Sequence, residues 1–430
     1  MLDTLRTYLK LTSWPIILAM LVLMSIGYMA ISASERADPD MQGYATKQAI
    51  FACVGLLAFV GIALVPYQVV GRLAYPLFAV TLAILVLVLM LPEIHHGARR
   101  WIGLGVIAIQ PSELAKISFI ILLAWYLRMG DHYRKLLGLA VPFVLTFVPM
   151  GLVLIEPDLG TSLLFLPTLY IMLFMAGAKL RHLLGIVVLA TVLLFLPVPR
   201  TLPADMPSSE RLDHKALAYW SDHESGRVVS AASLVKMKAH QISRIVGWLR
   251  QDQPRVVQGK GYQLYLSKMV LGAGCITGQS QDSLVNEYFR MLPEDHTDFI
   301  FSVIGGQWGL AGCVGVLLCY VLIFISGVEI AVSTYDPFGR LLAVGVMALM
   351  FSQLFINAGM TMGLMPITGM TLPLVSYGGS SLVVNCLALG LLVNVGQRRP
   401  ILLSKRPFEF GEKKEKPPAP YGPFGETGTP

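Results

Sequence analysis

A cluster of ionisable residues stands directly before a long apolar run in the C-terminal half of the chain. Within five positions of the segment MLPEDHTDFIFSVIGGQWGLAG lie Glu294, Asp295, His296 and Asp298. A carboxylate or an imidazole in such a place can act as a general base, and ionisable groups at a membrane boundary indicate a functional site. The alternative is that Asp298 only caps the helix expected to start near Phe299. These residues alone leave both interpretations open.

A second polar island, QPSELAK, combines an acid and a base at helical spacing. Pro111 suits the first position of a helix, and Glu113 and Lys116 are three residues apart, so they share a helix face. Arg99 and Arg100 precede this island in the same short segment. Three cations that converge on one cavity would suit a phosphate group, and we favour this interpretation. The alternative is an ion pair at the membrane interface whose lysine reaches outward to water.

Two more islands interrupt the apolar pattern. EPDLGT places Asp158 at the start of an apolar run, where its carboxylate serves either a functional site or a helix cap. LPLVSYGGSS places Ser376 between Pro373 and a pair of glycines. Irregular backbone at membrane depth is tolerated only beside a cavity or inside protein. These islands therefore add polar groups to the same kind of boundary as the first two.

The composition identifies an integral membrane protein. Hydrophobic residues make up 55% of the 430-residue chain and charged residues 14%, whereas globular chains carry about 25% charged residues. The five cysteines include no CxxC pair and the histidines no HExxH motif, so we expect neither structural disulfides nor a zinc site. The net charge of +7 is explained by basic loops on one side of the membrane and indicates no nucleic-acid partner.

Ten apolar runs predict ten membrane-spanning helices with both termini on one side. Lys and Arg are concentrated in the loops on the side of the termini, so the positive-inside rule makes that side cytoplasmic and places all four polar islands outside. The expected parts are a cytoplasmic N-terminus at 1–13, seven spans at 14–198, a large extracytoplasmic loop at 199–297, three spans at 298–396 and a disordered cytoplasmic tail at 397–430.

The large outer loop is basic and partly helical in pattern. Between Val228 and Leu249, apolar residues recur near helical spacing, which suits either a helix in the membrane interface or one packed on the bundle. Gly261–Gly274 is a second, more apolar piece that we expect to dip towards the membrane. From Arg227 to Lys268 there are eight basic residues and a single acid, which favours an anionic ligand or a lipid headgroup.

Five segments in this order, HGARRWIGLG, IQPSELAK, EPDLGTS, LPEDHTDFIFSVIG and LPLVSYGGSS, resemble the SEDS family, whose members are RodA, FtsW and SpoVE. The resemblance covers nearly all of residues 14–399 and leaves out an apparent insertion at about 202–239 and the C-terminal tail. It implies an all-α fold, namely that of a polytopic membrane protein. Such a protein has about ten transmembrane helices, with a large extracytoplasmic loop between the seventh and the eighth.

By motif, the family's essential aspartate corresponds to Asp298. Its cavity residues correspond to positions in the other islands, namely Arg100, Gln110, Glu113, Lys116 and Asp158. His296 and Ser376 are further candidates for contact with the substrate. We expect His296 to orient or cap rather than to act as a second base, because residues i and i+2 do not share a helix face. Family members often carry an acidic pair where this chain has Gly306 and Gln307, and we assign no role there.

The resemblance implies a peptidoglycan glycosyltransferase that polymerises Lipid II, a disaccharide-pentapeptide on undecaprenyl diphosphate, at the bacterial cytoplasmic (inner) membrane. A GlcNAc 4-hydroxyl attacks the anomeric carbon of lipid-linked MurNAc with Asp298 as the general base. An α-linked donor and a β-linked product imply inversion, hence direct displacement. Lys116 and Arg100 would neutralise the leaving diphosphate, with a divalent cation, Mg²⁺ or Mn²⁺, left open as a cofactor. The implied partner is a class B penicillin-binding protein that cross-links the product.

Two other classes of function compete with the enzyme. A flippase for lipid-linked precursors would also need many spans and broken helices, but it should show polar groups through the midplane or an internal repeat, and we see no convincing repeat. A scaffold that only positions a partner would leave Glu113, Lys116 and Asp298 without a role. Within the family, FSVIGGQWG is most similar to RodA members, which elongate the wall and shape the cell, whereas HGARRWI and SYGGSSLVVN suit FtsW members of cell division equally well.

Overall fold

The computed structural model describes residues 11–37, 42–90, 101–104, 107–130, 132–156, 158–195, 197–199, 228–230, 244, 247–249, 251, 259, 261–279, 292 and 296–398. Arg99, Arg100, Glu294 and Asp295 lie outside the described residues. So do the predicted insertion, most of the predicted outer loop and the tail beyond Arg398.

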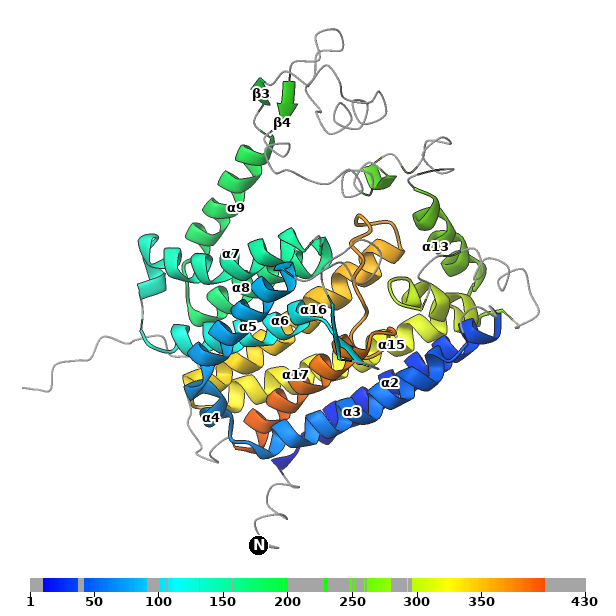
Figure 1. The fold of residues 1–430 in the computed structure, drawn as a ribbon, viewed down its shortest axis with the longest axis horizontal. Helices are drawn as coiled ribbons and strands as arrows, with labels where there is room; N and C mark the ends of the chain where they lie inside the picture. Colours follow the sequence, from blue (N-terminus) through cyan, green and yellow to red (C-terminus); the bar gives the residue numbers. More distant parts are fainter. Residues whose placement is uncertain are drawn as a thin grey trace, which may run out of the picture.

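Within these residues the chain is almost wholly helical (Figure 1). The longer helices are α2 (Trp14–Ala37), α3 (Tyr44–Leu64), α5 (Ala74–Met90), α6 (Pro111–Leu127), α7 (Ala140–Ile155), α8 (Leu159–Ala176), α9 (Leu180–Phe195), α13 (Tyr262–Ala273), α15 (Ile300–Ser333), α16 (Pro337–Thr361) and α17 (Gly379–Gln397). The shorter elements are α4 (Tyr67–Arg72), two 3₁₀ turns (His132–Arg134 and Leu137–Leu139) and two antiparallel strand pairs, β1 (Ile102–Leu104) with β2 (Ile107–Ile109) and β3 (Pro197–Pro199) with β4 (Val228–Ser230).

The predicted all-α, multi-pass membrane fold is confirmed. Seven described helical stretches are long and apolar enough to cross a membrane, and Ala74–Met90 and Leu180–Val192 are shorter apolar helices. Helix α6 is apolar after its first two turns, which carry Glu113 and Lys116. Helices therefore form at the predicted apolar runs, because in a bilayer only a helix satisfies its own backbone groups. The exact number of spans remains a prediction.

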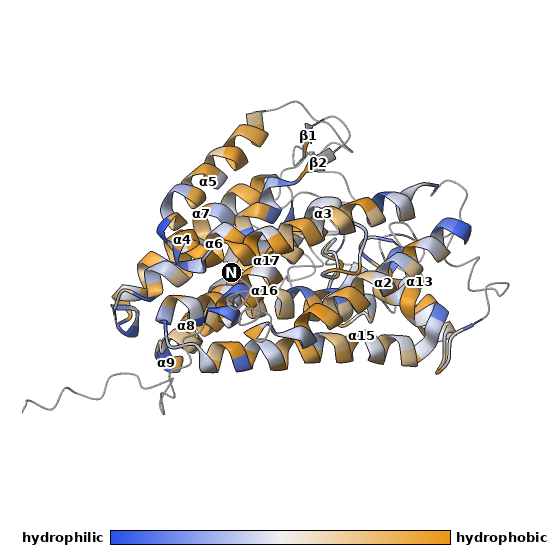
Figure 2. Ribbon diagram, turned by 90° about the horizontal axis from the view of Figure 1, so that it is seen from below, coloured by the Kyte–Doolittle hydropathy of each residue, from blue (hydrophilic) through white to orange (hydrophobic). Residues whose placement is uncertain are grey.

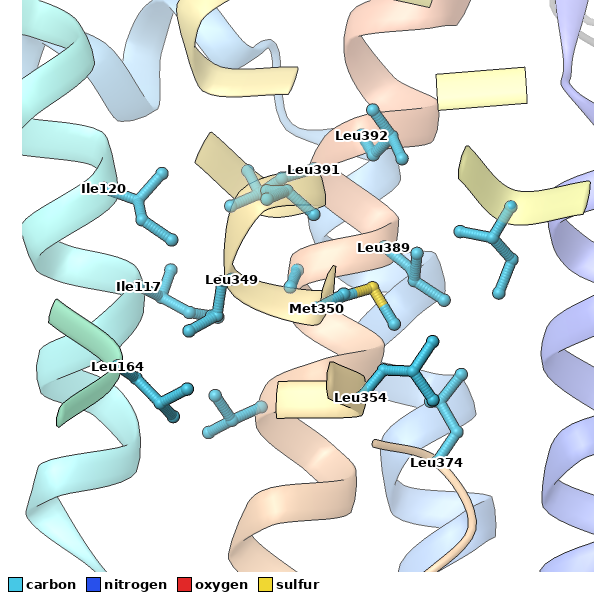
Figure 3. Packing of buried hydrophobic residues seen from close by; sticks show 14 of the residues in the cluster. Ile117, Ile120, Leu164, Leu349, Met350, Leu354, Leu374, Leu389, Leu391 and Leu392 are labelled. Atoms are coloured by element: carbon cyan, nitrogen blue, oxygen red, sulfur yellow. The ribbon is translucent and has the colours of Figure 1, made fainter. Parts of the chain in front are cut away.

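The most buried of the long helices are α6, α16 and α17. In α6, 14 of 17 residues are buried, and 78% of the most apolar stretch of α16 and of α17 is buried, against 17% for α3. Figure 3 shows Leu349 of α16 directed towards Ile117 of α6 and Leu164 of α8, with Leu389 of α17 beside Met350 on the other side. The outer helices are apolar along most of their length as well (Figure 2), since their other faces meet lipid. Hydrophobicity therefore does not separate the central helices from the peripheral ones.

Helix α15 starts where the sequence predicts the eighth span but is not continuous. A helix was expected to start near Phe299, and α15 runs from Ile300 to Ser333 but is interrupted at Gly309, whose φ of 62° is left-handed. The part after Gly309 is long enough to cross a hydrocarbon core of about 30 Å at about 1.5 Å per residue. The part before it, 300–308, is a separate short section that begins directly after Asp298.

The described pieces of the outer loop fit the prediction in part. Val228–Ser230 forms strand β4, which pairs with β3 at the end of α9, so the predicted helical pattern does not begin at Val228. Most of the stretch up to Leu249 lies outside the described residues. The more apolar piece forms α13, which packs against α15 as an amphipathic helix with buried Leu264, Leu266 and Val270.

Candidate active site

Three consecutive backbone carbonyls fix the chain immediately before α15. The His296 carbonyl accepts a hydrogen bond from the Tyr377 amide at 2.9 Å, and the Thr297 carbonyl accepts one from Ser376 Oγ at 2.6 Å. The Asp298 carbonyl accepts one from Asn357 Nδ2 of α16 at 2.9 Å. The segment 296–298 therefore contacts the segment 376–377 of the LPLVSYGGSS island. This contact fixes the position of the backbone that carries the Asp298 side chain.

Ser376 connects several elements to this point. Its hydroxyl donates to Thr297 and also accepts from the Leu372 amide at 2.8 Å, and its own carbonyl accepts from Gln48 Nε2 of α3 at 3.2 Å. The residue is only 4% exposed. Ser376 therefore supports the backbone next to Asp298. The contact of Ser376 with substrate stays a prediction.

His296 lies in a cluster of three rings at the N-terminal end of α3. Its ring centroid lies 4.8 Å from that of Tyr44 and 5.5 Å from that of Tyr377, and the two tyrosine rings lie 4.9 Å apart in an edge-to-face arrangement. The His296 side chain is buried. This packing agrees with the expectation that His296 orients the segment. Burial, together with Tyr44, raises the pKa of the Tyr377 hydroxyl, which therefore stays protonated at neutral pH.

A glycine turn in the α16–α17 connection, orange in Figure 1, lies close to both Asp298 and a cationic side chain. A Cβ on Gly369, whose φ is +75°, would lie 3.4 Å from Asp298 Oδ2 and 3.2 Å from Nη1 of Arg244. The carboxylate and the guanidinium thus reach the same small space over Gly369. Arg244 was not among the predicted site residues, although the basic bias of its segment pointed to an anionic ligand.

Asp158 sits at the start of α8 with both of its carboxylate oxygens occupied. Oδ1 accepts from the Thr161 amide at 3.0 Å, which is a helix cap, and Oδ2 accepts from Gln110 Nε2 at 2.7 Å and from Ser112 Oγ at 3.3 Å. The Asp158 side chain is buried. These bonds tie α6 to α8 and favour the capping interpretation of Asp158, with Gln110 as part of the same network.

Glu113 and Lys116 form the predicted pair on one face of α6. Lys116 Nζ lies 2.9 Å from both Oε1 and Oε2 of Glu113, and both side chains are buried. A buried charged pair of this geometry is held by its mutual attraction, because either charge alone would be poorly solvated. Arg100 lies outside the described residues, so the predicted convergence of Arg100 with Lys116 stays a prediction.

The loop at 368–370 links the two polar regions. A Cβ on Gly160, in the first turn of α8, would lie 2.5 Å from Met370 Cγ and 2.8 Å from the Thr368 carbonyl oxygen. The turn capped by Asp158 therefore packs directly on the loop that faces Asp298 and Arg244. Within the described ranges, no group of three or more His, Cys, Asp or Glu residues is arranged to hold a metal ion.

Comparison with known proteins identifies the family. A family model described as "Cell cycle protein", which covers FtsW, RodA and SpoVE, matches residues 8–207 and 215–400. Peptidoglycan glycosyltransferase RodA of Treponema pallidum is 31% identical, over 89% of this chain and 97% of its own length. Peptidoglycan glycosyltransferase MrdB of Escherichia coli strain K12 is 30% identical, over 92% and 96%.

Solved structures agree with this assignment. A structure described as the structural coordination of polymerization and crosslinking by a peptidoglycan synthase complex superposes with a TM-score of 0.70 at 27% identity, over 90% of this chain and 98% of that one. The rod shape determining protein RodA of Thermus thermophilus superposes with a TM-score of 0.61 at 25% identity, over 90% and 97%. The chain belongs to the FtsW/RodA/SpoVE family of multi-pass membrane glycosyltransferases.

Proposed function

We propose that this protein is a peptidoglycan glycosyltransferase that polymerises Lipid II into glycan strands and releases undecaprenyl diphosphate. The observation that carries the proposal is the Asp298 carboxylate, which projects from a backbone fixed by Ser376, Tyr377 and Asn357 into the space that it shares with Arg244. The names of the family relatives support the same reaction class.

Asp298 is the general base in this proposal. The 4-hydroxyl oxygen of the acceptor GlcNAc attacks the anomeric carbon of the donor MurNAc, and the hydroxyl proton passes to the Asp298 carboxylate. The bond between the anomeric carbon and the diphosphate oxygen breaks with its electron pair, so the configuration inverts. In this proposal Asp158 instead caps α8 and binds Gln110, and Glu113 pairs with Lys116.

The leaving diphosphate needs positive charge rather than a general acid. Arg244 brings a guanidinium to within 3.2 Å of the position that a Cβ on Gly369 would take, and a planar guanidinium suits a phosphate group. Lys116 and Arg100 are the further cations of the proposal. A divalent cation held by one carboxylate and the substrate phosphates fits this donor set, since Mg²⁺ is commonly bound in that way. Proton transfer to Asp298 and neutralisation of charge by the arginine and lysine side chains do not depend on such a cation.

We also propose that the protein acts beside a class B penicillin-binding protein in the cytoplasmic membrane, with both termini in the cytoplasm. The peptidoglycan synthase complex among the similar structures coordinates polymerization with crosslinking, which supports such a partner. A role in elongation and cell shape rather than in septal synthesis is supported by the RodA and MrdB relatives and the rod shape determining protein.

Removal of the Arg244 guanidinium is expected to weaken catalysis without unfolding the bundle. Arg244→Ala should lower kcat/KM for Lipid II about 100-fold, the order seen when a charge-stabilising donor is lost. Arg244→Lys should lose less, because it keeps the charge but not the planar fork. Arg128→Ala is the matched control, since it removes another guanidinium, which lies 3.3 Å from the ring centroid of Trp125 at the C-terminal end of α6. Wild-type activity in a folded Arg244→Ala protein would contradict the role of Arg244.

The proposed function is tested by glycan synthesis from purified Lipid II. The purified chain, alone and with a class B penicillin-binding protein, should yield glycan strands that a muramidase digests. A flippase would move Lipid II between the leaflets of a vesicle and make no strand, and a scaffold would do neither. Synthesis that appears only from the partner and never requires this chain would overturn the proposal.

A further inference from the structure

The short section of α15 before its break is held from the side by α13. Ser267 of α13 lies with its Oγ 2.7 Å from Ser302 Oγ of α15 and donates to the Thr361 carbonyl of α16 at 3.0 Å. Because the Ser267 hydroxyl has one hydrogen and directs it to Thr361, Ser302 is the donor to Ser267. Ser267, Ser302 and Thr361 have no exposed surface. Three helices are therefore joined by one buried pair of hydroxyl groups.

The segment that follows α13 forms hydrogen bonds to α15 on both sides of its break. The Leu310 amide donates to the Cys275 carbonyl at 2.9 Å and the Ala311 amide to the Ile276 carbonyl at 3.0 Å, while the Gln279 amide donates to the Gly306 carbonyl at 3.2 Å. The segment after α13 thus supplies partners that a continuous helix would have found within itself.

Glycine is required at the break for two reasons. Gly309 has a left-handed backbone, and a Cβ there would come within 2.4 Å of the Gly278 amide nitrogen. Section 300–308 is thereby separated from the following helix by a conformational break, and it is bonded to α13 near its start and to the segment after α13 near its end.

We infer that α13 and section 300–308 form one positioning unit for Asp298, with Ser267 as the positioning residue. Ser302 lies four residues after Asp298, and its amide donates to the carbonyl of Phe299, the residue next to Asp298, at 2.9 Å, so section 300–308 is bonded to the chain that carries the carboxylate. Helix α16 contacts both Asp298 and α13. Asn357 of α16 donates a hydrogen bond to the Asp298 carbonyl, and the Thr361 carbonyl of α16 accepts one from Ser267. This inference rests on the proposed role of Asp298 and extends it to a residue that does not touch substrate.

The reason for an effect on the reaction is geometric. Misplacement of a catalytic group by about 1 Å can cost about 100-fold in rate. Ser267→Ala removes the acceptor of Ser302 and the donor to Thr361 and frees section 300–308 to move. We expect kcat for Lipid II to fall at least about 10-fold with little change in KM, because the groups that bind the diphosphate are not altered. Ser267→Thr keeps the hydroxyl and should restore most of kcat.

The matched control is Ser352→Ala, which removes a buried hydroxyl of α16 that, within the described part of the chain, bonds to the Ala348 carbonyl of its own helix. It should leave kcat unchanged. A second readout does not depend on activity: hydrogen exchange of the amides of 300–308 should accelerate in Ser267→Ala and Ser302→Ala but not in Ser352→Ala. Ser302→Ala also serves if Ser267→Ala does not fold.

Each outcome decides the inference. Faster exchange at 300–308 together with a lowered kcat, both reversed in Ser267→Thr, supports it. Unchanged exchange in the folded Ser267→Ala and Ser302→Ala proteins overturns the positioning unit, and faster exchange with wild-type kcat shows that it does not position Asp298. A wild type that makes no glycan overturns the proposed function instead, and the exchange experiment then still decides whether Ser267 holds section 300–308.

Discussion

Replacement of Asp298 by asparagine is expected to lower the turnover of Lipid II about 100- to 10,000-fold, the usual contribution of general-base catalysis. The amide has nearly the size of the carboxylate and keeps an acceptor oxygen, but it cannot take up the hydroxyl proton. The backbone bonds from Ser376, Tyr377 and Asn357 end on main-chain carbonyls at 296–298, so they do not depend on this side chain. The variant should therefore fold and still bind Lipid II.

The matched control for this change is Asp336→Asn. Asp336 caps the opposite end of α16 through the Phe338 and Gly339 amides, and asparagine caps helices about as well as aspartate. The control variant should polymerise at the wild-type rate. If the folded Asp298→Asn protein also matches the wild-type rate, Asp298 is a structural residue only, and the base must be sought at Asp158 or Glu113.

Removal of the Lys116 ammonium is expected to abolish turnover. Lys116→Ala leaves the buried carboxylate of Glu113 without its cation, and loss of one partner of a buried pair costs about 3–5 kcal/mol of stability. Folding must therefore be measured together with activity, by thermal unfolding and by binding of the partner. A well-folded Lys116→Ala protein with near wild-type polymerisation would refute a role for Lys116 in the reaction.

A double variant separates the structural cost from the catalytic one. Glu113→Leu combined with Lys116→Met replaces the pair by apolar side chains of similar size, which is often neutral or stabilising for a buried pair. We expect this double variant to recover the stability that Lys116→Ala loses but not the activity. Recovery of polymerisation along with stability would show that the pair serves only to hold α6.

The sequence was most informative where the physical cause is local. A bilayer forces apolar runs into helices, so the helices form at the predicted runs. The spacing of Glu113 and Lys116 fixed their common face in the same way, and the buried pair confirms it. Asp158 was equally a cap or a functional group in the sequence, and its bonds to Thr161, Gln110 and Ser112 favour the cap.

What the sequence left out depends on contacts between distant segments. Arg244 and Asp298 both approach the turn at Gly369, and no local pattern in the sequence connects these three positions. The interruption at Gly309 was hidden because a single glycine inside a long apolar run is compatible with an unbroken helix. The amides that follow the break bond to the carbonyls of Cys275 and Ile276, which belong to a distant segment of the sequence.

The most direct test of the account measures Lipid II binding and glycan synthesis in the same membrane preparation of the wild type and of Asp298→Asn. Each protein is reconstituted with a class B penicillin-binding protein whose transpeptidase is blocked, and labelled Lipid II is followed into bound substrate and into strands. If Asp298 is the general base, the two proteins should bind Lipid II equally, and Asp298→Asn should make strands at no more than about one hundredth of the wild-type rate. Strands at equal rates from both proteins, or none from a folded wild type that binds Lipid II, would contradict it.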